Sequence, residues 1–232
     1  SLSQDILRSA YEKLNLGQII SKATVWSEIA GTSFYKIAWN GLSGKKIYDK
    51  DGKLVYEGEV EVTALSPFEI YPDNNYAEDI DECESIIHAK AYSVKAIKNI
   101  WGVDVKGTEV DVFDASTSLN PVKQKNQAIV IEKYESPSVE YPDGRLIIVC
   151  DDKLLYMGEL PYINGTDGKR GFPFVKQVCM RIPNCFWGRS VIEKLIPVQR
   201  AYNAVKNRKH EFLNRLSMGV LTVEDGSVDI DD

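Results

Sequence analysis

The sequence lacks the short motifs that mark most catalytic and cofactor-binding sites. It contains no G-x-S-x-G turn for a serine nucleophile and no G-x-x-x-x-G-K-[S/T] loop for a phosphate group. The glycine-rich stretch NGTDGKRG (164–171) does not fit the second pattern, and we expect it to be a surface loop. The two histidines, His88 and His210, stand in no His-x-x-x-His or Glu-x-x-His pair. We therefore expect no catalytic residue, no cofactor and no metal site, and a protein that is not an enzyme.

Cysteine pairs and long apolar runs are missing as well. The four cysteines, Cys83, Cys150, Cys179 and Cys185, form no C-x-x-C pair, so free thiols in a reducing compartment are expected. No apolar run reaches the roughly 18 residues that a membrane span needs, and no secretory signal is present. We expect no membrane partner, and we expect the chain to be a central fragment of a longer protein.

One acidic loop is the best candidate for metal chemistry. Residues 78–84 carry five carboxylates and no basic residue. A metal-dependent nuclease that uses Asp79 and Asp81 therefore stays an alternative. The loop has no histidine and no glycine at the turn position of a calcium loop, so a solvated loop is the favoured interpretation.

The pattern of apolar residues predicts an α+β protein. Helical spacing covers residues 3–30, with a break at Gly17 and an end at Gly31, and a short helix follows Ser93. Asp51-Gly52 indicates a hairpin turn, and residues 103–126 have no clear pattern. The predicted strands cover 33–40, 45–49, 53–57, 59–65, 84–90, 128–135, 145–150, 153–160 and 172–180.

The longest periodic segment predicts a helix from Val191 to Leu216. Ser190 and Glu193 fit a capping box, in which each side chain accepts a hydrogen bond from a free amide of the first turn. Pro197 lies inside the helix and is expected to kink it or to split off its first turns. A seven-residue spacing predicts an apolar seam for helix packing, interrupted by Lys209 and otherwise formed by Val191, Leu195, Val198, Tyr202, Val205, Phe212 and Leu216.

This helix is basic in an otherwise acidic chain. The formal net charge of the chain is -6 and its pI is about 5.2, which argues against a protein that simply coats nucleic acid. A solvated helix face explains most such clusters. A contact with DNA phosphates or with acidic surface on another subunit is the functional alternative for Arg200, Lys206, Arg208, Lys209 and Arg215.

Several stretches resemble the portal proteins (head-tail connectors) of tailed bacteriophages and prophages. The most specific one is W-G-x-S followed by E-x-L-x-P-x-Q-x-x-Y-N, which runs from Trp187 to Asn203. The other stretches fall in the expected order between about residues 5 and 226. They are EIAGTSFYKIAWN (28–40), VTALSPFEIYPD (62–73), YPDGRLIIVCDDKLLYMGELPY (141–162) and FPFVKQVCMRIP (172–183).

The resemblance implies a non-catalytic ring, usually of twelve subunits in the full-length protein, at one vertex of the virion capsid. Double-stranded DNA passes through its channel during packaging. The terminase docks on it, head-completion and tail adaptor proteins follow, and capsid or scaffold protein surrounds it. Assembly takes place in the cytoplasm of the bacterial host.

The resemblance also implies a division of the chain. A wing-like α+β part covers residues 1–91, and a first stem-like helix with its connector covers 92–126. A β-rich clip-like part covers 127–182, a second stem-like helix covers 183–218, and residues 219–232 begin the return to the wing and the channel loop. The helix after Ser93 is short for a stem helix unless residues 103–126 continue it, and no crown sequence is present.

The charge balance fits a channel, because each added phosphate contact strengthens DNA binding and slows its passage. Another phage head or tail adaptor protein remains an alternative. Such a protein would form rings but would lack the helix–clip–helix order.

Overall fold

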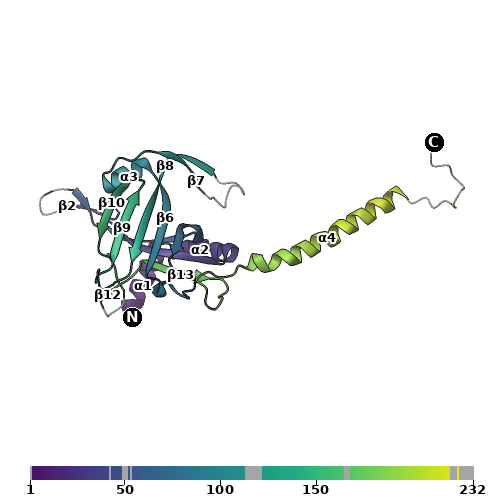
Figure 1. The fold of residues 1–232 in the computed structure, drawn as a ribbon, viewed down its shortest axis with the longest axis horizontal. Helices are drawn as coiled ribbons and strands as arrows, with labels where there is room; N and C mark the ends of the chain where they lie inside the picture. The colour runs from purple at the N-terminus through teal and green to yellow at the C-terminus, as the bar shows by residue number, and fades with distance from the viewer. Residues whose placement is uncertain are drawn as a thin grey trace. The chain divides into compact units, whose positions relative to one another are not determined.

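The computed structural model describes residues 2–41, 43–48, 52, 54–112, 122–164, 168–219 and 224. The chain divides into an N-terminal unit, Ser1–Ser190, and a C-terminal unit, Val191–Asp232. The N-terminal unit combines helices with antiparallel sheets (Figure 1). The α+β class expected from the sequence is therefore confirmed.

Two helices open the chain, and they are separated two residues earlier than predicted. α1 (Leu2–Lys13) and α2 (Leu16–Ala30) flank Asn15, whose φ of 51° is left-handed. The break expected at Gly17 is wrong, because asparagine also tolerates the left-handed region and makes the turn. Gly31 ends α2 as predicted, with a φ of 87° and its N–H donated to the Ser27 carbonyl.

A three-stranded antiparallel sheet packs against α2. Its strands lie in the order β13 (Phe174–Val178), β1 (Thr32–Asn40) and β4 (Glu59–Leu65). Between β1 and β4 the chain forms the hairpin predicted around Gly52, from β2 (Lys46–Tyr48) and β3 (Leu54–Tyr56). Gln177 on β13 accepts a hydrogen bond from the Tyr35 hydroxyl and donates one to Thr24 on α2. These bonds tie the sheet to the helix.

A larger antiparallel sheet forms the second layer. Its strands lie in the order β10 (Lys153–Gly158), β9 (Arg145–Cys150), β8 (Val122–Glu135), β6 (Ser85–Ser93) and β5 (Ile70–Pro72), with β7 (Thr108–Val112) paired to β8. α3 (Val94–Trp101) follows β6 directly. Ser93 caps α3 as predicted, because its hydroxyl accepts from the Ala96 N–H, and Gly102 ends it with a left-handed φ of 71°.

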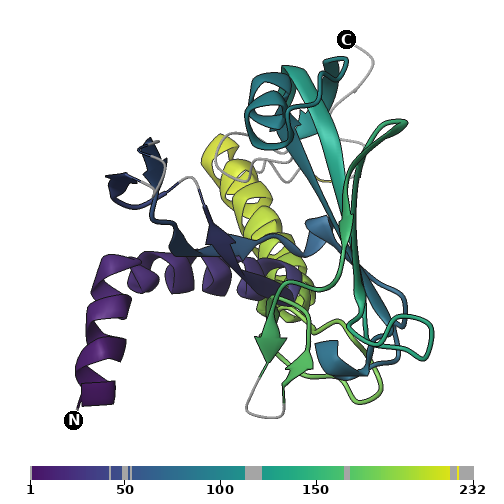
Figure 2. The same ribbon diagram turned by 90° about the vertical axis from the view of Figure 1, so that its left-hand side faces the viewer.

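The core lies between the two sheets. One cluster of buried apolar side chains joins Phe34 and Leu65 of the smaller sheet to Ile86, Val130 and Ile148 of the larger one. Figure 2 shows α1, α2 and α3 on one side of the larger sheet. Short segments complete the unit: η1 (Pro67–Glu69), η2 (Ile80–Glu82), β11 (Ile163–Asn164) and β12 (Lys169–Arg170).

The sheets join strands from the wing-like part, 1–91, with strands from the clip-like part, 127–182, which were expected to be separate. β6, from the wing-like part, pairs with β8, and β13, from the clip-like part, pairs with β1. Both parts therefore belong to one unit. The possibility that residues 103–126 continue a stem helix is wrong for the described residues, because 108–112 and 122–126 are strand. Residues 113–121 lie outside the described part.

The C-terminal unit contains one continuous helix, α4 (Val191–Met218). It begins directly after Ser190, as the predicted cap requires, although the reciprocal bonds of the capping box stay a prediction. Pro197 lies inside α4 without splitting it, so a separate first turn is ruled out. Of the expected return segment 219–232, only Gly219 and Glu224 are described. In the described part of the chain, no helix is long and apolar enough to cross a membrane.

Candidate interaction surface on the C-terminal helix and its anchor

The predicted seam forms an apolar strip along α4 that Lys209 interrupts. Consecutive residues of an α-helix are rotated by roughly 100°, so Val198, Tyr202, Val205, Phe212 and Leu216 fall within about 40° of one line along the helix. These five side chains are 55–66% exposed. An apolar strip of this length and exposure is typical of a surface that packs against another helix or sheet.

The predicted basic residues surround this seam unequally. At roughly 100° per residue, Lys206 and Arg208 flank the seam on opposite sides, each rotated roughly 80° from the seam line. Arg200 lies on the far side of the helix. Lys209 lies within the seam itself, and Arg215 donates to Glu211 one turn earlier, at 2.7 Å. Among the described residues, Arg200, Lys206, Arg208 and Lys209 form no ion pair. Their charges are therefore available to a partner.

Two side chains of the E-x-L-x-P-x-Q-x-x-Y-N motif are hydrogen-bonded to each other on α4. Gln199 donates its amide N–H to the Asn203 side-chain oxygen at 2.9 Å, one turn apart. The pair lies on an exposed part of the helix and stabilises one side-chain arrangement there. The Q-x-x-x-N spacing that carries the resemblance thus has a local physical role.

The segment that precedes α4 is hydrogen-bonded to a distant loop of the N-terminal unit. The Phe186 N–H donates to the Asn75 carbonyl at 2.9 Å, and the Trp187 indole N–H donates to the Asn75 side chain at 3.1 Å. The Asn184 N–H donates to the Glu78 carboxylate at 2.8 Å. Phe186 is fully buried. We call residues 184–190 the anchor segment.

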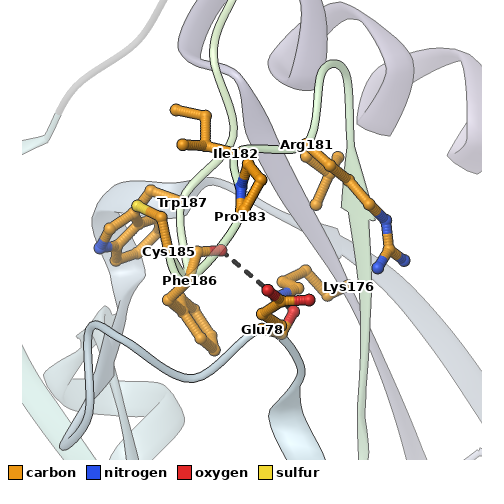
Figure 3. A pocket seen from close by; sticks show the side chains of 9 residues that line it. Glu78, Lys176, Arg181, Ile182, Pro183, Cys185, Phe186 and Trp187 are labelled. Carbon is orange, nitrogen blue, oxygen red and sulfur yellow. Dashed lines mark hydrogen bonds between the residues drawn. The ribbon is translucent and has the colours of Figure 1, made fainter.

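Lys176 lies under the anchor segment and bonds to it. Its ammonium donates to the Phe186 carbonyl at 3.3 Å (Figure 3). It also donates to the Glu78 carbonyl at 2.6 Å and lies 4.3 Å from the Phe186 ring centroid. Burial lowers the pKa of Lys176. A pocket of about 260 Å³ opens beside these groups. The bonds show that Lys176 supports the anchor segment.

Two glycines meet where the anchor segment crosses the end of α2. A Cβ on Gly31 would lie 2.1 Å from the Gly188 carbonyl oxygen, and a Cβ on Gly188 would lie 2.3 Å from a Val178 methyl. The Gly188 N–H also donates to the Thr32 hydroxyl at 2.7 Å. Glycine is required at both positions because the two backbones touch. This contact explains the glycine of W-G-x-S, for which the sequence alone gives no reason.

The acidic loop 78–84 has structural roles. The Asp79 carboxylate caps η2 by accepting from the Ile80 N–H, Glu78 holds the anchor segment, and Glu82 accepts from the Glu78 N–H. Among the described residues, no group of three or more His, Cys, Asp or Glu side chains is arranged to hold a metal ion. Nothing in this geometry favours the nuclease alternative.

A buried charged cluster, which the sequence interpretation missed, connects the two sheets. Glu132 on β8 pairs with Lys36 on β1, lies 2.9 Å from His88 Nδ1 on β6, and accepts from the Tyr134 hydroxyl at 2.9 Å. A cavity of about 520 Å³ opens beside it. The sequence does contain a pattern that places these two groups on the buried face. In AIVIEKYE, strand alternation puts Glu132 on the same side as Val130 and Tyr134. In ESIIHAK it puts His88 on the same side as Ile86.

The chemistry of this cluster fits a structural role. Burial alone would raise the pKa of Glu132, but the hydrogen bond with His88 and the charge of Lys36 outweigh it and lower the pKa from 4.5 to about 2. A carboxylate with so low a pKa is a poor general base near neutral pH. Burial also raises the pKa of Tyr134 well above its usual value. We interpret the cluster as an ionic link between the sheets.

The cluster predicts a specific dependence of stability on acid. The pKa of Glu132 is lower in the folded than in the unfolded protein, so its contribution is present above about pH 4.5 and is lost as the pH falls toward 2. Urea unfolding of the parent protein should therefore show a marked fall in free energy across this window. Glu132→Gln should show a smaller fall across the same pH values. Equal slopes would contradict the link.

Comparisons with known proteins identify no relative of this chain. The chain matches no model of a known protein family, and no curated protein matches its sequence at a significant level.

Proposed function

We propose that this chain is the central part of a phage portal protein, a non-catalytic subunit of a ring that conducts double-stranded DNA into and out of a capsid. The observation that carries the proposal is α4, a continuous helix of 28 residues with an exposed apolar seam. It follows the anchor segment within the motif that resembles portal proteins, and that motif now has a physical explanation in Gly188 and the Gln199–Asn203 pair.

The seam would hold neighbouring copies together in the ring. The flanking Lys206 and Arg208 would pair with acidic groups of the next subunit or reach the DNA in the channel. An acidic chain with few free basic groups suits a channel, because weak phosphate contacts let the polyanion slide. Terminase during packaging, head-completion and tail adaptor proteins afterwards, and capsid or scaffold protein would be its partners.

One observation favours the second candidate, a head or tail adaptor protein. Strands from the clip-like part share sheets with strands from the wing-like part, and α3 has only eight residues. The described residues thus lack a pair of long helices on either side of a separate clip. A ring protein that joins the capsid after packaging would be compatible with this arrangement.

The two candidates differ in when the protein enters the capsid. Procapsids isolated before DNA packaging should contain this protein if it is a portal, because the terminase must dock on it first. Immunoblotting of purified procapsids and of mature, DNA-filled heads provides the comparison. A protein absent from procapsids and present in filled heads would contradict the portal proposal and support the adaptor.

A further inference from the structure

The larger sheet has a second face that is apolar and exposed. Direct pairing places Ile131 opposite Val149, Leu154 opposite Val149, Met157 opposite Ile147, and Tyr71 opposite Ile87, all on the side away from the core. Its most exposed members are 38–61% accessible: Tyr71, Ile129, Ile131, Leu154 and Met157. We call this side the outer face.

The outer face does not have the pattern of a face in contact with water. Antiparallel sheets with one solvated side usually alternate apolar and polar residues. Here the core side and the outer side are both apolar along β9 (RLIIVC), after its first residue, and in the AIVI segment (128–131) of β8. The charged groups of the outer face, Lys133, Glu135 and Arg145, pair with one another at one end, at 2.7 and 2.6 Å.

The helices of the N-terminal unit leave this face uncovered. Figure 2 shows α1, α2 and α3 on the opposite side of the sheet. Ile97 of α3 is fully buried in the core on that side. Exposed apolar area over several strands marks a binding surface.

The α4 helix matches the outer face in length and is opposite in charge to the N-terminal unit. From Val198 to Leu216 its seam is about 27 Å long at 1.5 Å per residue, and five strands at about 4.8 Å spacing are about 19 Å wide. α4 carries six basic residues against two acidic ones, whereas residues 1–190 carry 27 acidic against 22 basic ones. Opposite net charge favours the approach of one to the other.

We propose that the outer face of one copy binds the apolar seam of α4 from a second copy. The two surfaces differ, so the contact is head-to-tail, and such contacts form a ring when the rotation between neighbouring copies closes. This inference rests on the proposed function and names the two surfaces that join neighbouring subunits. Lys209 at the middle of the seam and the flanking Lys206 and Arg208 would face the more acidic unit.

Disulfide trapping between two singly substituted full-length proteins tests the contact. One protein carries Ile131→Cys on the sheet, the other Val205→Cys on α4, and both carry Cys179→Ser and Cys185→Ser to remove the half-buried thiols. Asn207→Cys is the matched control, because it is rotated roughly 200° from Val205 on the same helix. Mixed under mild oxidation, the seam pair should form a dimer at least about tenfold faster than the control pair, since bound copies raise the effective thiol concentration.

The outcomes separate this inference from the proposed function. Rings that show equal trapping with Val205→Cys and Asn207→Cys would overturn the interface and leave the ring standing. A bond formed only inside one chain, in a protein that carries both Ile131→Cys and Val205→Cys, would also overturn it. Absence of rings in the full-length protein would overturn the proposed function together with the interface.

Discussion

Replacing Gly31 by alanine is expected to destabilise the N-terminal unit by more than about 3 kcal/mol, the range of severe overpacking combined with backbone strain. The added methyl group would lie 2.1 Å from the Gly188 carbonyl oxygen, and both atoms belong to or are attached directly to backbone. This clash can therefore be relieved only if the anchor segment moves away from the end of α2. Urea unfolding followed by circular dichroism measures the loss.

Gly102 provides a matched control for this substitution. It also ends a helix with a left-handed φ, 71° against 87° for Gly31, but nothing lies within 4 Å of its added Cβ. Gly102→Ala should therefore cost only the backbone strain, about 1–2 kcal/mol. Equal losses in the two variants would show that the Gly31–Gly188 contact does not constrain the fold.

Replacing Glu132 by glutamine is expected to cost about 3 kcal/mol of unfolding free energy, because it leaves the Lys36 ammonium without its counter-ion between the sheets. The side chains of this pair are only 15% and 8% exposed, so water cannot substitute well for the lost charge. Lys36→Met should cost a similar amount for the same reason. Chemical unfolding at neutral pH provides both values.

A double-mutant cycle tests whether the two effects share one cause. Lys36→Met with Glu132→Gln should lose clearly less than the sum of the single variants, since neither partner is then left charged and alone. Glu61→Gln, at an exposed position on β4, should change stability by less than about 0.5 kcal/mol. Strict additivity in the cycle would refute the ionic link.

Local structure was predictable wherever neighbouring residues determine it. Ser93 and Gly102 bracket α3, and Gly31 ends α2, because caps depend on a few adjacent backbone groups. The bounds of β4 and β9 also follow from their apolar patterns. The seam of α4 was likewise readable from its seven-residue spacing.

Long-range pairing was not predictable from the sequence. Alternation shows which side of β13 faces a core, but it does not show that β13 pairs with β1, some 140 residues earlier in the chain. The division into wing-like and clip-like parts therefore did not anticipate that they share sheets. The Gly31–Gly188 contact was hidden for the same reason, because the two glycines lie far apart in the chain and only Gly31 has a local explanation, as the end of α2.

We propose that this chain, within its full-length protein, forms a ring around a DNA channel. Electron microscopy of the purified full-length protein, with its mass measured in solution, tests it most directly. We expect closed rings with a central hole and a mass equal to a whole number of subunits, usually twelve in the portal proteins that the chain resembles. A protein that remains monomeric at high concentration, or forms compact particles without a hole, would contradict it.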